Sequence, residues 1–295
     1  MSGAAIIGVD WGSSSMRAMR IAADGRILDV RRADDGVFTG SGDFETRLRA
    51  HLGNWMSDGP ALPLILCGMI GSDRGWCPAG YVAAPAGLAD LANALTSAAF
   101  DGVARIVPGV GYSCGDEAEV MRGEETLVMG FLAQTGLADA RLCLPGTHSK
   151  WLRVRRGQIE GFRTYMTGEL RALLLQSGAL ATGVAQEASP DAFVQGMRTS
   201  ASALGRSLFQ ARARRLLGAL RAEWTASYVS GVLIGNEVAA ESGKEDSGVP
   251  LFILARDALA RDYALALSGV PHTIVDPEPL AAPGLLRIAR QAGLA

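Results

Sequence analysis

The chain has 295 residues, of which 48% are hydrophobic and 20% are charged, and its formal net charge is −2. This length suffices for two domains, and the composition is typical of a soluble globular enzyme with a substantial core. The nearly neutral charge argues against nucleic acid or an anionic membrane surface as a partner.

No membrane-spanning run or secretory leader is evident, because no stretch of 18 apolar residues occurs and Asp10 interrupts the first apolar run. The four cysteines include no C-x-x-C pair, so we expect free thiols in a reducing cytoplasm. With only three histidines, no zinc site stands out. A basic cluster is interpreted as the solvated face of a helix rather than a binding patch. Its members are Arg212, Arg214, Arg215 and Arg221.

The first half of the chain reads as three strands, a helix, a further strand and a second helix. Asp24-Gly25 is a hairpin signal between the second and third strands, and Asp43 is a plausible N-cap for the first helix. These elements are expected at residues 4–9, 16–22, 27–31, 43–56, 62–66 and roughly 124–132.

The same order returns roughly 135 residues later, which predicts a duplicated architecture. The alternative is two unrelated α/β halves with a similar strand order. The duplication places a boundary after residue 134 and gives domains 1–134 and 135–295. In the second half, strands are expected at residues 141–144, 151–155, 159–165, 226–234, 251–254 and 272–275, helices from Thr167 and at 256–267 and 284–292, and an exposed loop at 241–249.

Each half carries a polar, glycine-containing turn directly after its first strand, at residues 12–15 and 146–149. Glycine lets a backbone approach a ligand closely, and amides and hydroxyls donate to anionic oxygens. Asp10, at the end of the first strand, can hold a hydrated Mg²⁺. The pattern favours nucleotide phosphates, with an ordinary Gly-Ser hairpin as the alternative; it matches neither the P-loop nor the dinucleotide-binding glycine pattern.

Four further segments carry a family resemblance: 67–76, 120–126, 144–151 and 165–170. With the two turns, they resemble the 2-dehydro-3-deoxygalactonokinase family of the sugar kinase, heat-shock-70 and actin superfamily, over nearly the whole chain. The resemblance implies two ribonuclease-H-like (actin-like ATPase) α/β domains of βββαβαβα plan around a nucleotide cleft. It also implies phosphorylation of the 6-hydroxyl of 2-dehydro-3-deoxy-D-galactonate by MgATP, in galactonate catabolism.

Three alternatives stay open beside that activity. The first is a kinase for a different sugar or sugar acid, such as 2-dehydro-3-deoxygluconate. The second is a non-catalytic sugar-sensing protein of the same fold, although the first strand leaves no room for a preceding DNA-binding module. The third is a filament-forming protein. A homodimer is left open.

For catalysis, the superfamily places an aspartate at the start of the helix that ends the first domain, and this chain has Gly123-Glu124-Glu125 there instead. Glu124 is the predicted general base, because a carboxylate at a helix N-terminus is favoured by the helix dipole. Glu125 and Asp116 are rivals, and all three acids could instead cap the helix. Asp10 is predicted to act in catalysis through the metal.

Ligand contacts are assigned in three groups. The phosphates of ATP are expected at Gly12, Ser13, Ser14, Ser15, Gly146, Thr147, His148 and Ser149, with Lys150 or Arg17 offsetting their charge. The sugar acid is expected at Gly68, Met69, Ile70, Gly71, Ser72, Arg74 and Arg122, where an arginine would hold its carboxylate. Adenosine is expected at Gly231 and Gly235, because the rival segment 251–257 carries alanine where glycine is usual. Trp11 is a better ligand platform than Trp76, although both suit a core.

Overall fold

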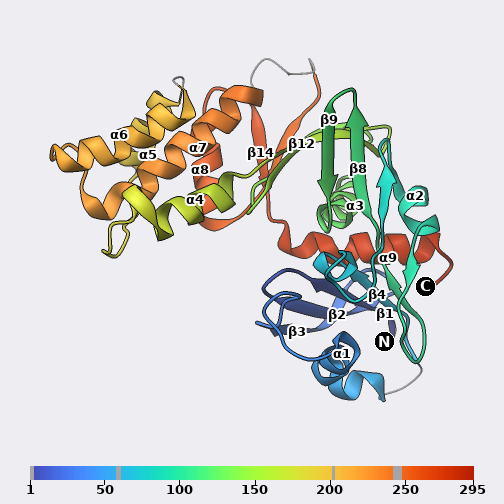
Figure 1. The fold of residues 1–295 in the computed structure, drawn as a ribbon. Helices are drawn as coiled ribbons and strands as arrows, with labels where there is room; N and C mark the ends of the chain where they lie inside the picture. The colour runs from blue at the N-terminus through green and yellow to red at the C-terminus, as the bar shows by residue number, and fades with distance from the viewer. Residues whose placement is uncertain (1–2, 58–60, 201–202, 242–247) are drawn as a thin grey trace. The chain divides into compact units, whose positions relative to one another are not determined.

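The computed structural model describes residues 3–57, 61–200, 203–241 and 248–295. The chain forms two compact units (Figure 1). The first unit comprises residues 1–139, 154–162 and 277–295, and the second comprises 140–153 and 163–276. The C-terminal segment therefore packs with the first unit, which a single division after residue 134 does not anticipate.

The first unit is built on a six-stranded sheet with the order β3-β2-β1-β4-β7-β6. The strand β1 pairs antiparallel with β2 and parallel with β4, and β4 pairs parallel with β7. Every residue of β4 is buried, as expected for a strand covered on both faces. The strands are β1 (Ala4–Trp11), β2 (Met16–Ala22), β3 (Ile27–Ala33), β4 (Leu64–Cys67), β6 (Thr96–Ser97) and β7 (Ala104–Ile106).

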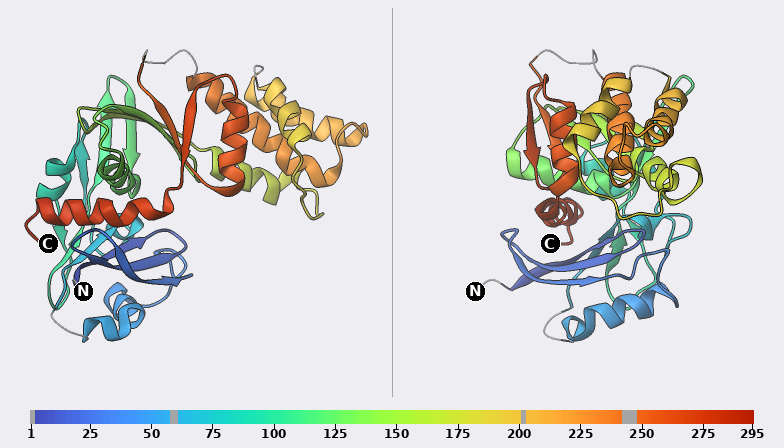
Figure 2. Two further views of the ribbon diagram at one scale, coloured as in Figure 1. Left: turned by 180° about the vertical axis from the view of Figure 1, so that it is seen from behind. Right: turned by 90° about the vertical axis from the view of Figure 1, so that its left-hand side faces the viewer.

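Helices cover both faces of this sheet. Figure 2 shows α1 on one face and α9 lying along the other, where α9 contacts β1, β2 and β4. The helices α3 and α9 cross closely, because a side chain at Gly130 or Gly284 would overlap the backbone of the other helix or the turn before it. The helices are α1 (Phe44–Leu52), α2 (Leu88–Asn93), α3 (Glu124–Thr135) and α9 (Ala281–Gln291), with short 3₁₀ turns at Gly53–Met56, Met69–Gly71 and Glu278–Leu280.

A separate three-stranded sheet, with the order β5-β8-β9, leads into α3. Its strands are β5 (Tyr81–Ala83), β8 (Gly109–Cys114) and β9 (Glu117–Met121). This sheet was not predicted from the sequence. Its shortest strand has three residues and pairs with a partner far along the chain, so no local periodicity marks it.

The second unit contains a five-stranded sheet with the order β12-β11-β10-β13-β14. This order repeats β3-β2-β1-β4-β7 of the first unit, which confirms the duplicated plan. In both sheets the strand that comes first in the sequence lies third in the order. It pairs parallel with the fourth strand in the order, which is β4 in the first unit and β13 in the second. The strands are β10 (Ala140–Leu144), β11 (Ser149–Arg155), β12 (Gln158–Tyr165), β13 (Leu251–Leu254) and β14 (His272–Val275).

A group of helices follows β12, and one of them replaces a predicted strand. The strand expected at residues 226–234 is wrong, because this segment lies inside α7 (Thr225–Glu241). This helix is buried on nearly all sides, so it is apolar all round and shows no amphipathic period. The other helices are α4 (Thr167–Gln176), α5 (Pro190–Thr199), α6 (Leu204–Leu216) and α8 (Asp257–Ala266), with 3₁₀ turns at Gly178–Leu180 and Ala222–Trp224.

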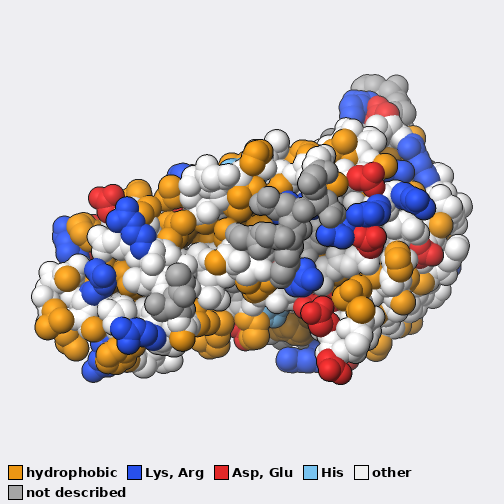
Figure 3. Space-filling model, turned by 90° about the horizontal axis from the view of Figure 1, so that it is seen from above, with side chains coloured by type: hydrophobic (Ala, Val, Ile, Leu, Met, Phe, Trp, Pro, Cys, Tyr) orange, Lys and Arg blue, Asp and Glu red, His pale blue; other side chains and the backbone are white. Residues whose placement is uncertain are grey.

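The basic cluster around α6 is not a single patch. Arg214 lies 5.8 Å from the ring of Tyr228, while Arg215 donates to the carbonyl of Ala179 at 3.1 Å. On the face of the molecule drawn in Figure 3, Lys and Arg side chains are interspersed with apolar ones. Among the described residues, no helix combines the length and apolar composition needed to cross a membrane. Most of the loop expected at 241–249 lies outside those residues.

Candidate functional site

Strand β1 carries Asp10 to its C-terminal end, level with the end of the parallel strand β4. There Asp10 Oδ2 lies 3.4 Å from Arg17 Nη2, and Cys67 Sγ lies 4.0 Å from Asp10 Oδ1. Partial burial raises the pKa of Asp10 above its usual range, and the Arg17 guanidinium opposes that rise. The carboxylate keeps 37% of its side-chain surface open, so it can still reach a ligand.

The first turn, residues 12–15, directs its carbonyl groups into the protein. Gly12 O accepts from Val37 N at 2.9 Å, and Ser13 O accepts from Phe38 N at 3.0 Å. Ser15 O accepts from Gly12 N at 2.9 Å. In the described part of the chain, the amides of residues 13–15 donate to no protein acceptor, and these three serines are exposed. The turn therefore presents amides and hydroxyls outward, as an anion-binding turn requires.

The loop over residues 68–72 follows β4 and lies beside this end of β1. Gly68 has φ +92°, and a Cβ there would come within 2.7 Å of Trp11 O, so glycine is required. Ile70 is wholly buried in the core and can offer a ligand only its backbone. Ser72 is buried, and its Oγ has no hydrogen-bond partner in the described chain.

Arg122 lies against this loop, because a Cβ on Gly71 would stand 2.9 Å from Arg122 Nη1. Its guanidinium lies 4.4 Å from the centre of the Tyr81 ring, and Nη2 donates to Gly80 O at 2.8 Å. The other two nitrogens, Nε and Nη1, are buried without a partner among the described residues. Buried donors without acceptors are rare in folded proteins, so these two nitrogens lack acceptors that a ligand could supply.

Arg74 occupies a different environment from Arg122. It is exposed, and its guanidinium lies 4.4 Å from the centre of the Phe38 ring. Phe38 itself is 41% exposed. Arg74 can therefore reach a ligand only from the surface of the loop.

The three candidate bases are separated by the fold. Glu124 is partly exposed at the start of α3, and its Oε2 accepts from Arg122 N at 2.9 Å. Glu125 is wholly buried and accepts from Gly123 N at 2.7 Å through Oε2. Burial, with Glu124 nearby, raises the pKa of Glu125 to about 8. Asp116 is exposed in the turn between β8 and β9, at the other end of β9 from α3. Glu124 is thus the acid of the three that combines exposure with a place beside Arg122.

In the second unit, the second turn (residues 146–149) follows β10 and packs against the start of α4. Thr147 O accepts from Glu169 N at 3.0 Å, and a side chain at Gly168 would overlap Gly146 O. Thr147 and His148 are exposed, and His148 Nε2 pairs with the Glu169 carboxylate. The turn offers backbone and short polar groups at its tip.

Two residues expected to contact phosphate point into the protein instead. Ser149 is 1% exposed, and its Oγ lies 2.8 Å from Tyr263 Oη. Lys150 is 4% exposed, and its Nζ donates to His148 O at 3.4 Å. The start of β11 holds both side chains in the interior, where Lys150 bonds the backbone of the tip from inside.

A buried carboxylate supports the second turn from below. Glu237, on α7, accepts from Trp151 Nε1 at 2.6 Å, from Tyr263 Oη at 2.9 Å and from Thr167 Oγ1. Burial raises its pKa, and these donors, with Ser149, oppose the rise. Glu237 was not predicted from the sequence, because its partners come from separate segments and no local spacing links them.

Three further expectations are corrected. Trp11 is wholly buried, and its Nε1 donates to Asp35 O at 2.8 Å, so it is a core residue and not a ligand platform. Gly231 and Gly235 lie inside α7 and face α5: a side chain at Gly231 would overlap Phe193 O, and a Cβ at Gly235 would lie 2.8 Å from Ser200 Oγ. Helix packing accounts for both glycines, which removes the reason to assign them to adenosine.

Known proteins of one family are similar to this chain over nearly its whole length. The model of the 2-keto-3-deoxy-galactonokinase family matches residues 10–288. A probable 2-dehydro-3-deoxygalactonokinase of Rhizobium meliloti (strain 1021) is 36% identical, over 96% of this chain and 95% of its own length. The 2-dehydro-3-deoxygalactonokinase of Escherichia coli (strain K12) is 38% identical, over 88% of this chain and 84% of its own.

One solved structure agrees with this assignment, and a second shows the fold alone. A crystal structure from Sinorhizobium meliloti, of a protein provisionally named a 2-dehydro-3-deoxygalactonokinase, has a TM-score of 0.85 and 35% identity, and covers 97% of this chain and 98% of its own. The activator of the 2-hydroxyisocaproyl-CoA dehydratase from Clostridium difficile, solved with ADPNP, has a TM-score of 0.53 and 10% identity, over 98% and 96% of the two chains, and shares only the actin-like ATPase fold. The chain is a member of the 2-keto-3-deoxy-galactonokinase family of sugar-acid kinases.

Proposed function

We propose that this enzyme transfers the γ-phosphoryl group of ATP to the 6-hydroxyl of 2-dehydro-3-deoxy-D-galactonate. The main support for an acidic substrate is Arg122, whose Nε and Nη1 are buried without a partner among the described residues. A sugar-acid carboxylate would supply an acceptor oxygen to one of these two donors, in a charge-assisted hydrogen bond. The unpartnered Ser72 Oγ, next to Gly71, adds a third donor.

The first turn suits the phosphates of ATP. Its carbonyls are held by the protein and its exposed amides face outward, so an anion meets donors rather than acceptors. In the second unit, the tip formed by Thr147 and His148 is a second candidate for phosphate oxygens. Phosphoryl transfer depends mainly on positioning and on neutralising charge, and such turns supply both.

Asp10 is the residue that would hold Mg²⁺. Its partly open carboxylate offers hard oxygen ligands at the strand end, and Mg²⁺ is usually bound by one or two carboxylates with water and phosphate as the remaining ligands. The bound ion would neutralise phosphate charge. Arg17, paired with Asp10 at 3.4 Å, keeps the carboxylate oriented.

Glu124 is the proposed general base. It lies at the first turn of α3, beside the Arg122 that would hold the substrate carboxylate. The acceptor oxygen of a carboxylate can take the proton of the attacking hydroxyl as the phosphoryl group arrives. All four cysteines are free thiols, which supports a reducing compartment, so we place the enzyme in the cytoplasm.

The direct test is release of ADP from ATP and Mg²⁺ with three acceptors measured side by side. These are 2-dehydro-3-deoxygalactonate, its gluconate epimer and galactose. We expect turnover with the galactonate and little with galactose, which has no carboxylate for Arg122. Absence of turnover with all three would contradict kinase activity, whereas preference for the gluconate epimer would overturn the substrate and leave the activity class intact.

A further inference from the structure

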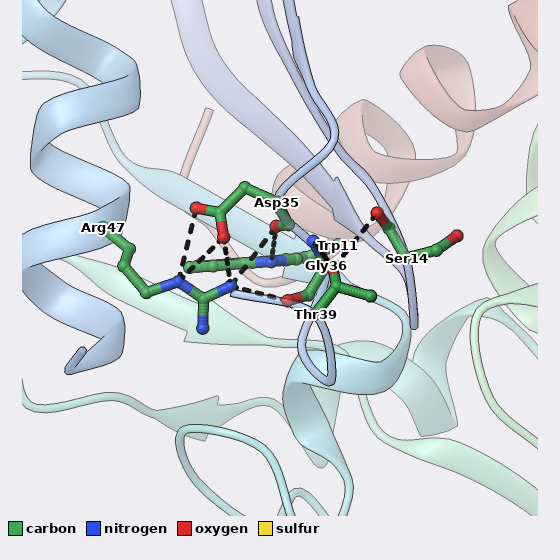
Figure 4. Close-up of polar contacts among 6 residues, drawn as sticks. All are labelled: Trp11, Ser14, Asp35, Gly36, Thr39 and Arg47. Atoms are coloured by element: carbon green, nitrogen blue, oxygen red, sulfur yellow. Dashed lines mark hydrogen bonds and ion pairs between the residues drawn. The ribbon is translucent and has the colours of Figure 1, made fainter. Parts of the chain in front are cut away.

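The first turn rests on a second loop, residues 35–40, called here the supporting loop. Besides the amides of Val37 and Phe38, which bind the carbonyls of Gly12 and Ser13, Thr39 Oγ1 lies 3.4 Å from Ser14 O and accepts from Gly36 N at 3.0 Å. Figure 4 shows Thr39 beside Ser14 in this arrangement. Three successive carbonyls of the turn are therefore bound by the supporting loop.

The supporting loop is itself fixed by Arg47 of α1. Arg47 Nη2 donates to Asp35 Oδ1 at 2.6 Å and to Gly36 O at 2.6 Å, and Nε donates to Asp35 Oδ1 at 3.1 Å. The guanidinium lies 5.1 Å from the centre of the Trp11 ring, and Trp11 donates to Asp35 O (Figure 4). Only 7% of the Arg47 side chain is exposed, compared with 31% for Asp35.

The contact between loop and turn leaves no space for a side chain. A Cβ on Gly36 would overlap the backbone of Ser13, and a Cβ on Gly40 would overlap the Arg47 guanidinium. Gly36 therefore packs directly on the backbone of the turn, so a displacement of the loop at Gly36 would displace the turn.

We propose that Arg47, with Asp35, is a positioning residue for phosphate binding, an inference that rests on the proposed function of the first turn. Arg47 fixes Asp35 and Gly36 of the supporting loop. The amides of residues 37 and 38 then hold the carbonyls of the turn inward. As a result, the amides of residues 13–15 point toward the phosphates. A buried arginine paired with one carboxylate and one carbonyl is expensive to maintain as a purely structural device. Its position directly beneath an anion-binding turn accounts for that cost.

The test compares Arg47→Lys with Arg49→Lys, a matched control on the same helix whose arginine pairs with Glu45 at the surface. Calorimetry measures the Kd of ADP with Mg²⁺ and, separately, the Kd of the sugar acid without nucleotide. Lysine keeps the charge but loses the fork that joins Asp35 to Gly36. For Arg47→Lys we expect the nucleotide Kd to rise about tenfold and the sugar-acid Kd to stay within about twofold; for Arg49→Lys both stay unchanged.

A second variant, Asp35→Asn, removes the carboxylate and keeps the loop, and it should also raise the nucleotide Kd. The double variant Arg47→Lys with Asp35→Asn should have a nucleotide Kd no higher than that of the more severe single variant. An unchanged nucleotide Kd in a variant that melts as the wild type does would overturn the proposal. So would an equal loss of both affinities, which indicates general structural damage. Because nucleotide binding is read without turnover, a wild-type enzyme that binds ADP but phosphorylates no sugar acid would contradict the proposed function alone.

Discussion

The two turns proposed to bind phosphate follow the equivalent strands of two sheets that share a five-strand order, yet different ionisable residues support them. Beneath the first turn, the buried cation Arg47 donates to a carboxylate and a carbonyl of the supporting loop. Beneath the second turn, the buried carboxyl group of Glu237 accepts from an indole, a phenol and a hydroxyl. A duplicated topology therefore preserves where a turn lies without preserving how it is held.

The difference has a chemical consequence. The first turn lies beside Asp10, so it combines outward amides with the carboxylate proposed to hold Mg²⁺. The second turn follows Leu144 and Pro145 and has no acid at the corresponding position. We expect loss of a charged side chain to impair activity most at the first turn, and loss of packing to impair it at the second turn.

The largest effect is expected at Asp10. Asp10→Asn keeps the size of the side chain and removes the charge that holds Mg²⁺, so turnover should fall by about 1000-fold, or ~4 kcal/mol in the activation barrier. The matched change at the second turn, His148→Gln, should cost about tenfold. Steady-state kinetics at saturating Mg²⁺ measure both, and equal losses at the two turns would contradict the asymmetry.

Glu237 should dominate the stability of the second unit. Glu237→Ala leaves the buried donors of Trp151, Tyr263 and Thr167 without an acceptor, which should reduce the free energy of unfolding by about 3 kcal/mol. The exposed Glu187→Ala should change it by less than about 0.5 kcal/mol. Urea unfolding followed by circular dichroism checks both, and a small loss for Glu237→Ala would show that the network is not needed.

A smaller effect is expected where α4 packs against the second turn. A side chain at Gly168 would overlap Gly146 O, so Gly168→Ala should displace the turn and raise KM for ATP about tenfold, with KM for the sugar acid little changed. Gly205→Ala is the control, because a Cβ there meets open space. Equal KM values for ATP in the two variants would indicate that the second turn does not contact the nucleotide.

The last effect is a pH dependence of stability set by Glu125, the smallest of the four per pH unit. Its pKa is raised to about 8 in the folded chain from an ordinary 4.5. Between these values the folded chain retains a proton that the unfolded chain has lost, so the free energy of unfolding falls as pH rises through this window. The contribution should stay below about 1.4 kcal/mol per pH unit. Glu125→Gln should flatten this slope in urea unfolding at pH 5, 6.5 and 8; an unchanged slope would assign it to other groups.

Local patterns predicted most of the two sheets. Residues 251–254 and 272–275 are strands as expected, and Asp43 does cap α1, accepting from Thr46 N at 2.9 Å. The prediction failed at α7, where burial on all sides erased the helical period and left an apolar run that also suits a strand. The small sheet β5-β8-β9 was missed because its strands are short and one of its two pairings is long-range.

In the candidate site too, local motifs identified some residues and missed others. Short motifs marked Asp10, the two turns and the loop around Gly68, because each is contiguous in sequence. Arg47 and Glu237 were not found, since each acts on partners that only the fold brings together. Glycine in an apolar segment was ambiguous: Gly231 looked like a ligand contact and proved to be a helix contact.

Selection of an acidic substrate by Arg122 can be tested with two substrates that differ only in the charge at C1. Steady-state kinetics compare kcat/KM for the acid, 2-dehydro-3-deoxygalactonate, with kcat/KM for its C1 amide in wild type and in Arg122→Gln, with Arg26→Gln as an exposed control. We predict a preference for the acid of about 100-fold in wild type and Arg26→Gln, falling below about tenfold in Arg122→Gln. A preference for the acid that stays unchanged in Arg122→Gln would show that Arg122 does not select the acid.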